Sequence, residues 1–360
     1  MKKSDSPFFT AACLTILLFL GFGSHGSAQE SSPYILQTGC RLELAGFPVM
    51  APALDAGTVV SVKGSVISWN PTFQDKPFGS ALPPGEEFYA EVVAPPSHAW
   101  LGHRLEIDEA ATRTRSDHSL VVMASPLNTR GLPDGSMIGA RLEVRRHLTV
   151  EALWGETVKN RLIFAGEKGD SFFFSVAGPG SPAGTRSATP RLDSQNLLAW
   201  LDPYSASLAK INQPMVIPPG TAVATTFGER RGSALGFSGV TKTWPTALPL
   251  QAGINLLAYP YPRDLRLGVD WGTTREGFQG AAKPSPTQDL IEIWAGKDRF
   301  VYAPELQADG GIRWRRLHPV FPNRDWASPA SYLDQIPVGQ GFVLRKAKAD
   351  PRHFFYTPNP

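Results

Sequence analysis

Cysteine is almost absent from this 360-residue chain, which contains only Cys13 and Cys40. Cys13 lies in an apolar leader, so the rest of the chain carries a single thiol and cannot form an internal disulfide. The fold must therefore be stabilised by the burial of apolar surface rather than by cross-links. Cys40 is expected to be a small buried apolar residue, rather than a reactive or intermolecular thiol.

The chain also lacks blocks of like charge, because its 35 Lys and Arg residues and 32 Asp and Glu residues are interspersed. This pattern argues against nucleic acid as a partner. Beyond Phe8–Phe22 no apolar run approaches the ~20 residues that a membrane-spanning helix needs, so no transmembrane segment is expected in the mature chain. No EF-hand loop and no phosphate-binding glycine loop occurs either, and the sequence predicts no cofactor.

The N-terminus has the pattern of a secretory signal peptide. Two lysines precede the apolar run Phe8–Phe22, and small residues follow up to Ala28. The run is short and its end is cleavable, so cleavage is expected after Ala28. The residues before Cys13 resemble a lipoprotein box, but most of the apolar run follows that cysteine, which favours cleavage over lipidation. The mature protein, Gln29–Pro360, is therefore expected in the periplasm, at the cell surface or outside the cell.

Turn-forming residues are abundant, with 34 glycines and 33 prolines scattered along the chain. The apolar segments between them are short and rich in Val, Ile, Phe, Tyr and Trp, and long 3.6-residue periodicity is missing. This composition predicts an all-β protein of sandwich- or barrel-like antiparallel sheets with few short helices. We expect short helices at Tyr204–Ile211 and Ala327–Asp334, a strand at Arg161–Ala165 and a long exposed loop at Ser175–Arg191.

Three pairs of segments resemble one another. Leu162–Gly166 with Phe172–Phe174 matches Glu292–Gly296 with Phe300–Tyr302, Val216–Val223 matches Gln335–Val343, and Leu36–Gly39 matches Leu250–Gly253. Trp200 and Trp314 lie between the first two blocks of their respective copies. The pattern predicts an internal repeat of a hairpin and an Ile-Pro-x-Gly segment, whose glycine takes the positive φ of a turn. Two unrelated hairpins made of common β residues are the alternative.

These features divide the chain into a signal peptide (1–28), an N-terminal β region (29–155) and a C-terminal β region (156–360) that carries the two related units. The length of the mature chain suits either two ordinary domains or one large all-β domain. The sequence leaves this choice open.

From Gly139 onward the chain contains an ordered series of short motifs. They are Gly139–Leu142, His147–Thr149, Asn255–Pro260, Asp289–Ile291 with Trp294, Arg313–Trp314, and Ile336–Arg345. Together they resemble an uncharacterised paralogous family of secreted proteins from verrucomicrobial-type bacteria. The resemblance implies an exported, β-rich protein, and the family brings no known activity, substrate or catalytic residues.

An esterase-like pattern is the sharpest enzymatic candidate. Gly169–Ser171 resembles the nucleophile block of GDSL-type esterases, and Asp350–His353 has their Asp-x-x-His spacing. Ser171 would attack, His353 would act as base and Asp350 would orient it. However, Ser171 is expected to open a strand rather than a helix, and the blocks that build the oxyanion hole in that family are missing. A hairpin turn explains the motif better.

Two other chemistries have weaker support in the sequence. His98 and His103 stand at i and i+5 in an extended segment, with Glu106, Asp108 and His118 later, which does not fit a helical metal site. A glycosidase needs two facing carboxylates, and the sequence does not show which ones would face each other. The candidates are Glu86, Glu87, Asp264, Asp270 and Glu276. The sequence therefore predicts no catalytic and no metal-binding residue.

Aromatic side chains are the remaining signal for a binding site. In an exported β protein, exposed Trp and Tyr rings suit stacking on sugars, although most aromatic residues are buried in cores. Five fall near expected loops or strand edges and are our candidate ligand-binding residues: Tyr259, Tyr261, Trp271, Trp314 and Trp326. Burial in the core is the alternative for each of them.

The sequence thus favours an exported, non-enzymatic binding or structural protein whose partner is a polysaccharide or another envelope protein. One alternative is a secreted hydrolase of an extracellular polymer or ester. Another is a cell-surface assembly subunit whose exposed strand edges pair with neighbouring molecules. Fold class alone does not choose among the three.

Overall fold

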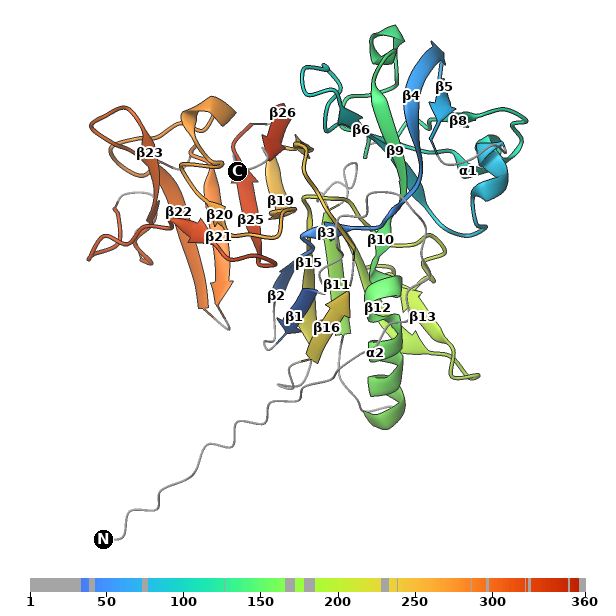
Figure 1. Cartoon of the computed structure of the whole chain (residues 1–360). Coiled ribbons are helices and arrows are strands. Elements are labelled where there is room, and N and C mark those ends of the chain that lie inside the picture. Colours follow the sequence, from blue (N-terminus) through green and yellow to red (C-terminus); the bar gives the residue numbers. More distant parts are fainter. Residues whose placement is uncertain are drawn as a thin grey trace.

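The structure is a computed structural model that describes most of the chain after the N-terminal leader. It covers residues 34–38, 43–72, 77–125, 127–165, 172–177, 185–227, 233–237, 239–285, 287–295, 298–320, 322, 325–348 and 350–355. The expected signal peptide, Cys40 and Ser171 lie outside these ranges, and the inferences about them stay predictions. The described residues form an antiparallel all-β architecture, as expected, in three parts: a barrel-like sheet and two β units (Figure 1).

The barrel-like sheet has six strands in the order β7-β6-β9-β4-β5-β8. Their bounds are Ala53–Lys63 (β4), Val66–Pro71 (β5), Phe88–Ala94 (β6), Arg104–Glu106 (β7), Ser119–Val121 (β8) and Arg141–Arg146 (β9). The edge strands approach each other beyond β7, where Ile107 bridges Val122 and the Met123 amide donates to the Glu106 carbonyl (3.0 Å). The sheet therefore curls round an interior of its own.

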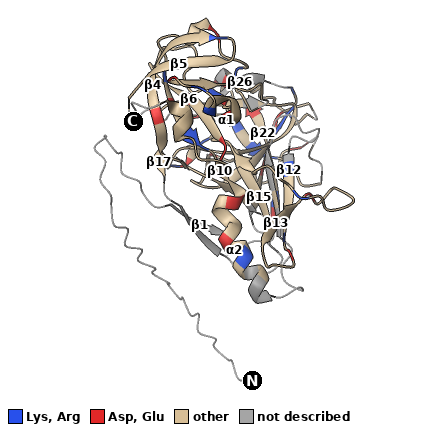
Figure 2. Ribbon diagram, turned by 90° about the vertical axis from the view of Figure 1, so that its right-hand side faces the viewer, with Lys and Arg blue, Asp and Glu red and all other residues tan. Residues whose placement is uncertain are grey.

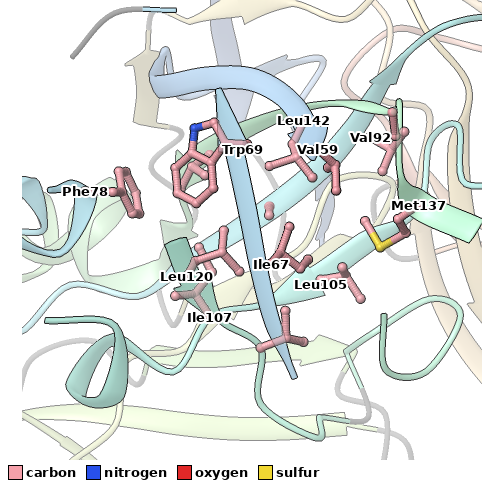
Figure 3. Packing of buried hydrophobic residues seen from close by; sticks show 14 of the residues in the cluster. Val59, Ile67, Trp69, Phe78, Val92, Leu105, Ile107, Leu120, Met137 and Leu142 are labelled. Carbon is pink, nitrogen blue, oxygen red and sulfur yellow. The ribbon is translucent and has the colours of Figure 1, made fainter. Parts of the chain in front are cut away.

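Alternation along the strands fills that interior. Phe88, Ala90 and Val92 of β6 point inward, whereas Tyr89 and Glu91 point to the opposite face. Aromatic and aliphatic side chains from all sides complete the barrel core (Figure 3). Three short helices border the sheet: η1 (Phe78–Ala81), α1 (Glu109–Arg113) and η2 (Gly135–Met137). The barrel is thus a packed core rather than a channel.

The first β unit is a five-stranded sheet in the order β13-β12-β11-β15-β2. Its strands are Glu43–Gly46 (β2), Phe172–Ala177 (β11), Thr185–Leu192 (β12), Leu198–Leu201 (β13) and Ala222–Phe227 (β15). Helix α2 (Val150–Ala165) covers one face, where the Trp154 ring packs against Phe174 and Phe47. Short ladders join the remaining strands: β1 (Tyr34–Thr38) with β16 (Ser233–Phe237), β3 (Val49–Met50) with β17 (Val240–Thr241), and β10 (Leu148–Thr149) with β14 (Val216–Ile217).

The second β unit is a five-stranded sheet in the order β19-β25-β21-β22-β23. Its strands are Gly253–Ala258 (β19), Leu290–Ala295 (β21), Asp298–Leu306 (β22), Ile312–Arg316 (β23) and Gly341–Lys346 (β25). Two ladders accompany it, β18 (Thr246–Leu250) with β26 (Asp350–Phe355) and β20 (Leu265–Arg266) with β24 (Gln335–Ile336). The segment between β20 and β21, which includes the turn η3 (Thr274–Glu276), covers the sheet and buries Trp271 and Phe278.

Helix α2 corrects several sequence-based expectations at once. The Thr149 hydroxyl accepts a hydrogen bond from the Ala152 amide, which caps the start of the helix. The helix then continues through Ala165, so the expected strand at Arg161–Ala165 and the hairpin that it was to form are wrong. The apolar run continues the helix that the residues from Val150 onward begin, and therefore does not form a separate strand. The division of the chain at 155/156 also falls inside this helix.

The two expected short helices are absent, because both segments pair with sheet edges. Along β23, the Arg316 amide donates to Ser331 and the Leu333 amide donates to Trp314, each at 2.8 Å. Along β13, the Ile211 amide donates to the Trp200 carbonyl, also at 2.8 Å. Tertiary hydrogen bonds thus override the local helical preference of these segments.

The same pairing covers the outer edges of both five-stranded sheets within the chain. This disfavours, for these edges, the assembly by edge pairing that the sequence left open. The expected loop at Ser175–Arg191 is also too long, since its first residues belong to β11 and its last to β12.

Two further features bear on partners. Basic and acidic residues are interspersed over the elements rather than segregated by sign (Figure 2). Among the described helices, none has the length and apolar character needed to cross a bilayer. Neither feature identifies a partner.

Candidate functional site

Four of the five aromatic candidates are buried in the core, which is the alternative stated for each of them, and they offer no surface to a ligand. They are Tyr259, Tyr261, Trp271 and Trp314, which expose at most 2% of their surface. Their polar atoms are used inside the unit: the Tyr261 hydroxyl donates to the Trp244 carbonyl (2.8 Å), and the Trp314 indole donates to Gly272 (3.0 Å). Aromatic rings bury a large apolar area, and here that area forms the centre of the second unit. Only Trp326 is half-buried and accessible.

The second β unit also contains an open groove with a volume of about 310 Å³. It lies between the segment 277–289 and the turn that follows β25. Its lining is rich in amides, hydroxyls and charged groups: Gly277, Gln279, Gly280, Ala281, Ser285, Thr287, Gln288, Asp289, Lys346, Ala347 and Lys348. We call this the 277–348 groove.

An ion pair fixes the two walls of the groove to each other. The Lys346 ammonium contacts the Asp289 carboxylate at 2.8 Å, and the other carboxylate oxygen accepts from the Ala347 amide, also at 2.8 Å. The Lys346 nitrogen also lies 4.4 Å from the centre of the Phe278 ring, a cation–π arrangement. Because Lys346 is the last residue of β25, the sheet itself sets the position of this wall.

Hydrogen bonds within the chain hold the other wall in shape. The Gln288 side chain accepts from the Ser285 amide (2.8 Å) and donates to the Pro304 carbonyl of β22 (3.2 Å). Gly280 lets the backbone of this wall lie against Leu306 at the end of β22. A Cβ at position 280 would come within 2.8 Å of the Leu306 backbone nitrogen. The groove is therefore supported by the sheet rather than by loop residues alone.

An aromatic patch adjoins the groove, and we call it the Trp326 patch: Trp326, Tyr332, Arg313, Arg315 and Glu305. The Trp326 indole donates to the carbonyl of Ala282, the neighbour of a groove-lining residue (3.2 Å). The Arg313 guanidinium lies 3.9 Å from the Tyr332 ring centre, and Arg315 lies 5.4 Å from that of Trp326. The Tyr332 hydroxyl donates to Glu305 (2.9 Å), a bond that raises the pKa of Tyr332.

Most groups of this site were missed by the sequence analysis. The available signal was the proline-containing loop at Ala281–Gln288, because loops on a rigid sheet often carry binding residues. Tyr332 was hidden in a segment expected to be helical. Lys346 and Asp289 gave no signal, since they meet only through the fold.

A second polar cluster lies buried between the barrel and the β units. The Glu91 carboxylate of β6 pairs with the Lys242 ammonium, and neither side chain is exposed. Burial lowers the pKa of Lys242 to about 8, although Glu91 acts in the opposite direction. Nearby on the same sheet, Arg104 donates to the Pro219 carbonyl of the first unit (2.6 Å). These bonds join parts that are distant in sequence, and we interpret the cluster as structural.

The metal-binding and carboxylate candidates taken from the sequence can be followed among the described residues, whereas Ser171 of the esterase-like pattern lies outside them. No group of three or more His, Cys, Asp or Glu side chains suited to a metal occurs among the described residues. His103 contacts the Thr129 hydroxyl (3.0 Å), and Asp108 caps α1. Of the carboxylate candidates, Asp270 pairs with Arg266, and Asp264 accepts from the Val338 amide. These groups have structural partners instead.

The groove and the Trp326 patch together offer hydrogen-bonding groups beside the half-buried Trp326 ring, which the Arg315 guanidinium also approaches. Such a combination suits a polar ligand that also has a flat apolar face. A scan against protein-family models finds no match to this chain, and a search of curated proteins finds none either.

Proposed function

We propose that this protein is an exported binding protein that holds a polysaccharide in the 277–348 groove. The observation that carries the proposal is an open, polar groove next to the half-buried Trp326. A sugar ring presents hydroxyls around its rim and C–H groups on its faces. Amide, hydroxyl and charged side chains match the rim, and an aromatic ring matches the face.

The size of the groove supports a polymer segment rather than a large compact ligand. Its volume of about 310 Å³ is at the lower end of the range of ~300–1,000 Å³ for small-molecule sites. The groove is open, so a chain can enter with a few residues and continue into solvent. The adjoining Trp326 patch extends the surface available to such a chain.

Binding rather than hydrolysis is what the groove geometry supports. Among the described residues that line it, Asp289 provides one carboxylate, which is held by Lys346 and the Ala347 amide. Glycosidases use two carboxyl groups that flank the scissile bond. The groove therefore provides recognition without the pair of groups that this reaction requires.

Affinity electrophoresis of the mature protein in gels cast with soluble polysaccharides tests the proposal. The panel should include neutral, uronic-acid and sulfated polymers. We expect one class of polymer to retard the protein in proportion to its concentration. Migration unchanged by every polymer would overturn the polysaccharide proposal.

Replacing Trp326 with alanine is expected to weaken that retention roughly tenfold, because loss of a stacking surface removes about 1.4 kcal/mol. Tyr204 supplies a matched control, since it lies in the first unit and 79% of its surface is exposed. Tyr204→Ala should leave retention unchanged. Equal losses in the two variants would show that binding does not involve the Trp326 patch.

A further inference from the structure

The two five-stranded sheets have the same strand order. Read from the interface outward, the first is β2-β15-β11-β12-β13 and the second is β19-β25-β21-β22-β23. The flanking ladders also correspond, since β1–β16 and β10–β14 take the places of β18–β26 and β20–β24. In each unit the partners follow one another in the same order along the chain. The barrel stands between β3 and β10, where the second unit has a short connection.

Equivalent residues agree in register as well as in order. In the first unit Pro190 of β12 pairs with Trp200 of β13, and in the second Pro304 of β22 pairs with Trp314 of β23. Both tryptophans are buried in the cores of their units. A Pro–Trp pair at one position of two sheets is a stronger correspondence than strand order alone.

The same kind of turn also precedes β15 in the first unit and β25 in the second. The Thr221 amide donates to Pro218, and the Gln340 amide donates to Pro337, each at 3.1 Å. Within these turns Gly220 has φ +85° and its counterpart at position 339 has φ +77°. A positive φ at the third residue is typical of a type II turn and favours glycine. The positive φ expected for the glycines of the Ile-Pro-x-Gly segments is therefore confirmed.

These equivalent turns make reciprocal hydrogen bonds across the contact between the units. The Gly46 amide of β2 donates to the Gly339 carbonyl (2.8 Å), and the Ala258 amide of β19 donates to the Gly220 carbonyl (3.1 Å). Two isolated β-bridges are reciprocal in the same way: Ala45 lies opposite Gln340, and Leu257 lies opposite Thr221. Both hydrogen bonds and both bridges are thus returned by the equivalent residues of the other unit.

Small residues alternate across this contact in the same reciprocal way. Gly46 faces Ala258, and Gly341 faces Ala222, so closely that a Cβ on either glycine would overlap the alanine Cβ. Equivalent positions therefore hold glycine in one unit and alanine in the other. Leu44 and Leu256, which belong to the same apolar cluster, also occupy equivalent positions in the two units.

We infer that the two β units are copies of one module, paired face to face about a pseudo-two-fold axis, with the barrel inserted into the first copy. The interface is isologous: the same patch, β2 with β15 or β19 with β25, is used by both partners. A second copy of the module is thus the partner that each patch fits. Gly46 with Ala258 and Gly341 with Ala222 are equivalent residues that meet each other across this contact, as residues beside a two-fold axis do.

Four double variants of the full chain, all with the same composition, test this inference. Gly46→Ala with Ala258→Gly and Gly341→Ala with Ala222→Gly exchange residues across the interface, so each new Cβ gains the space of a deleted one. A Cβ at position 341 would still lie 3.0 Å from the Leu44 Cβ. Gly46→Ala with Ala222→Gly and Gly341→Ala with Ala258→Gly exchange residues within one sheet. These leave each new Cβ facing an alanine.

Thermal unfolding of the four variants gives the result. We expect the cross-interface pairs to keep a Tm within about 3 °C of the wild type, and the within-sheet pairs to lose roughly 10 °C or fail to fold. Within each class the variant that carries Gly341→Ala should be the less stable, because of its added contact with Leu44. Cross-interface pairs as unstable as the within-sheet pairs would overturn the inference.

Discussion

Replacing Lys242 with alanine is expected to lower the free energy of unfolding by about 3–5 kcal/mol, because it leaves the Glu91 carboxylate buried without its counter-charge. Both side chains are fully buried between the barrel and the start of the second unit. The indole of Trp244 packs near the same ammonium (5.5 Å). Arg104 and Arg145 also carry charge close to this pair. They donate to the Pro219 and Ala51 carbonyls, so either would have to rearrange before it could replace the ammonium.

Urea denaturation, followed by tryptophan fluorescence and circular dichroism, measures the loss. Glu91→Leu combined with Lys242→Met should recover much of it, because replacing both partners by apolar groups removes the unpaired charge. Arg115→Ala serves as the control, since the Arg115–Asp117 pair is exposed and is worth at most about 1 kcal/mol. A loss below 1 kcal/mol for Lys242→Ala would contradict the role assigned to this pair.

Acidification is expected to destabilise the protein through His103. Burial lowers the pKa of His103 to about 4 in the folded state, and Arg130 and Arg104 add to this effect. The unfolded chain, with a pKa near 6.5, binds the proton more readily. The contribution of neutral His103 to the free energy of unfolding is therefore fully present above about pH 6.5. It is lost as the pH drops toward 4, which lowers the free energy of unfolding by about 3 kcal/mol.

Unfolding measurements at pH 7.5 and pH 4 on the wild type and on His103→Asn isolate the contribution. Asparagine keeps a polar group near Thr129, which contacts the His103 ring, but takes up no proton in this range. The loss of stability between the two pH values should be smaller in the variant by about 2–3 kcal/mol. The same pH dependence in both proteins would show that His103 does not contribute.

Local sequence patterns predict the β class and the turns of this fold. Alternating short apolar segments indicate antiparallel sheets, and the Ile-Pro-x-Gly segments mark the two positive-φ glycines. The patterns fail where distant partners decide the structure. Segments 204–211 and 327–334 pair with sheet edges instead of forming helices, and their partners are invisible to local preference.

The same limit explains the candidate site. Trp271 and Trp326 both stand near turn-forming residues, yet one is the centre of a core and the other is half-buried on the surface. The covering segment between β20 and β21 decides which of them is exposed. Likewise, the groove depends on Lys346 meeting Asp289 across 57 positions of sequence, which only the sheet brings about.

Hydrogen–deuterium exchange with and without the polysaccharide that retards the protein tests the central claim most directly. We expect the bound polymer to slow exchange in the segments 277–289 and 346–348, and in the strand and turn around Trp326. The barrel and the first unit should exchange as in the free protein. Protection confined to the barrel or the first unit, with none around the 277–348 groove, would contradict the account.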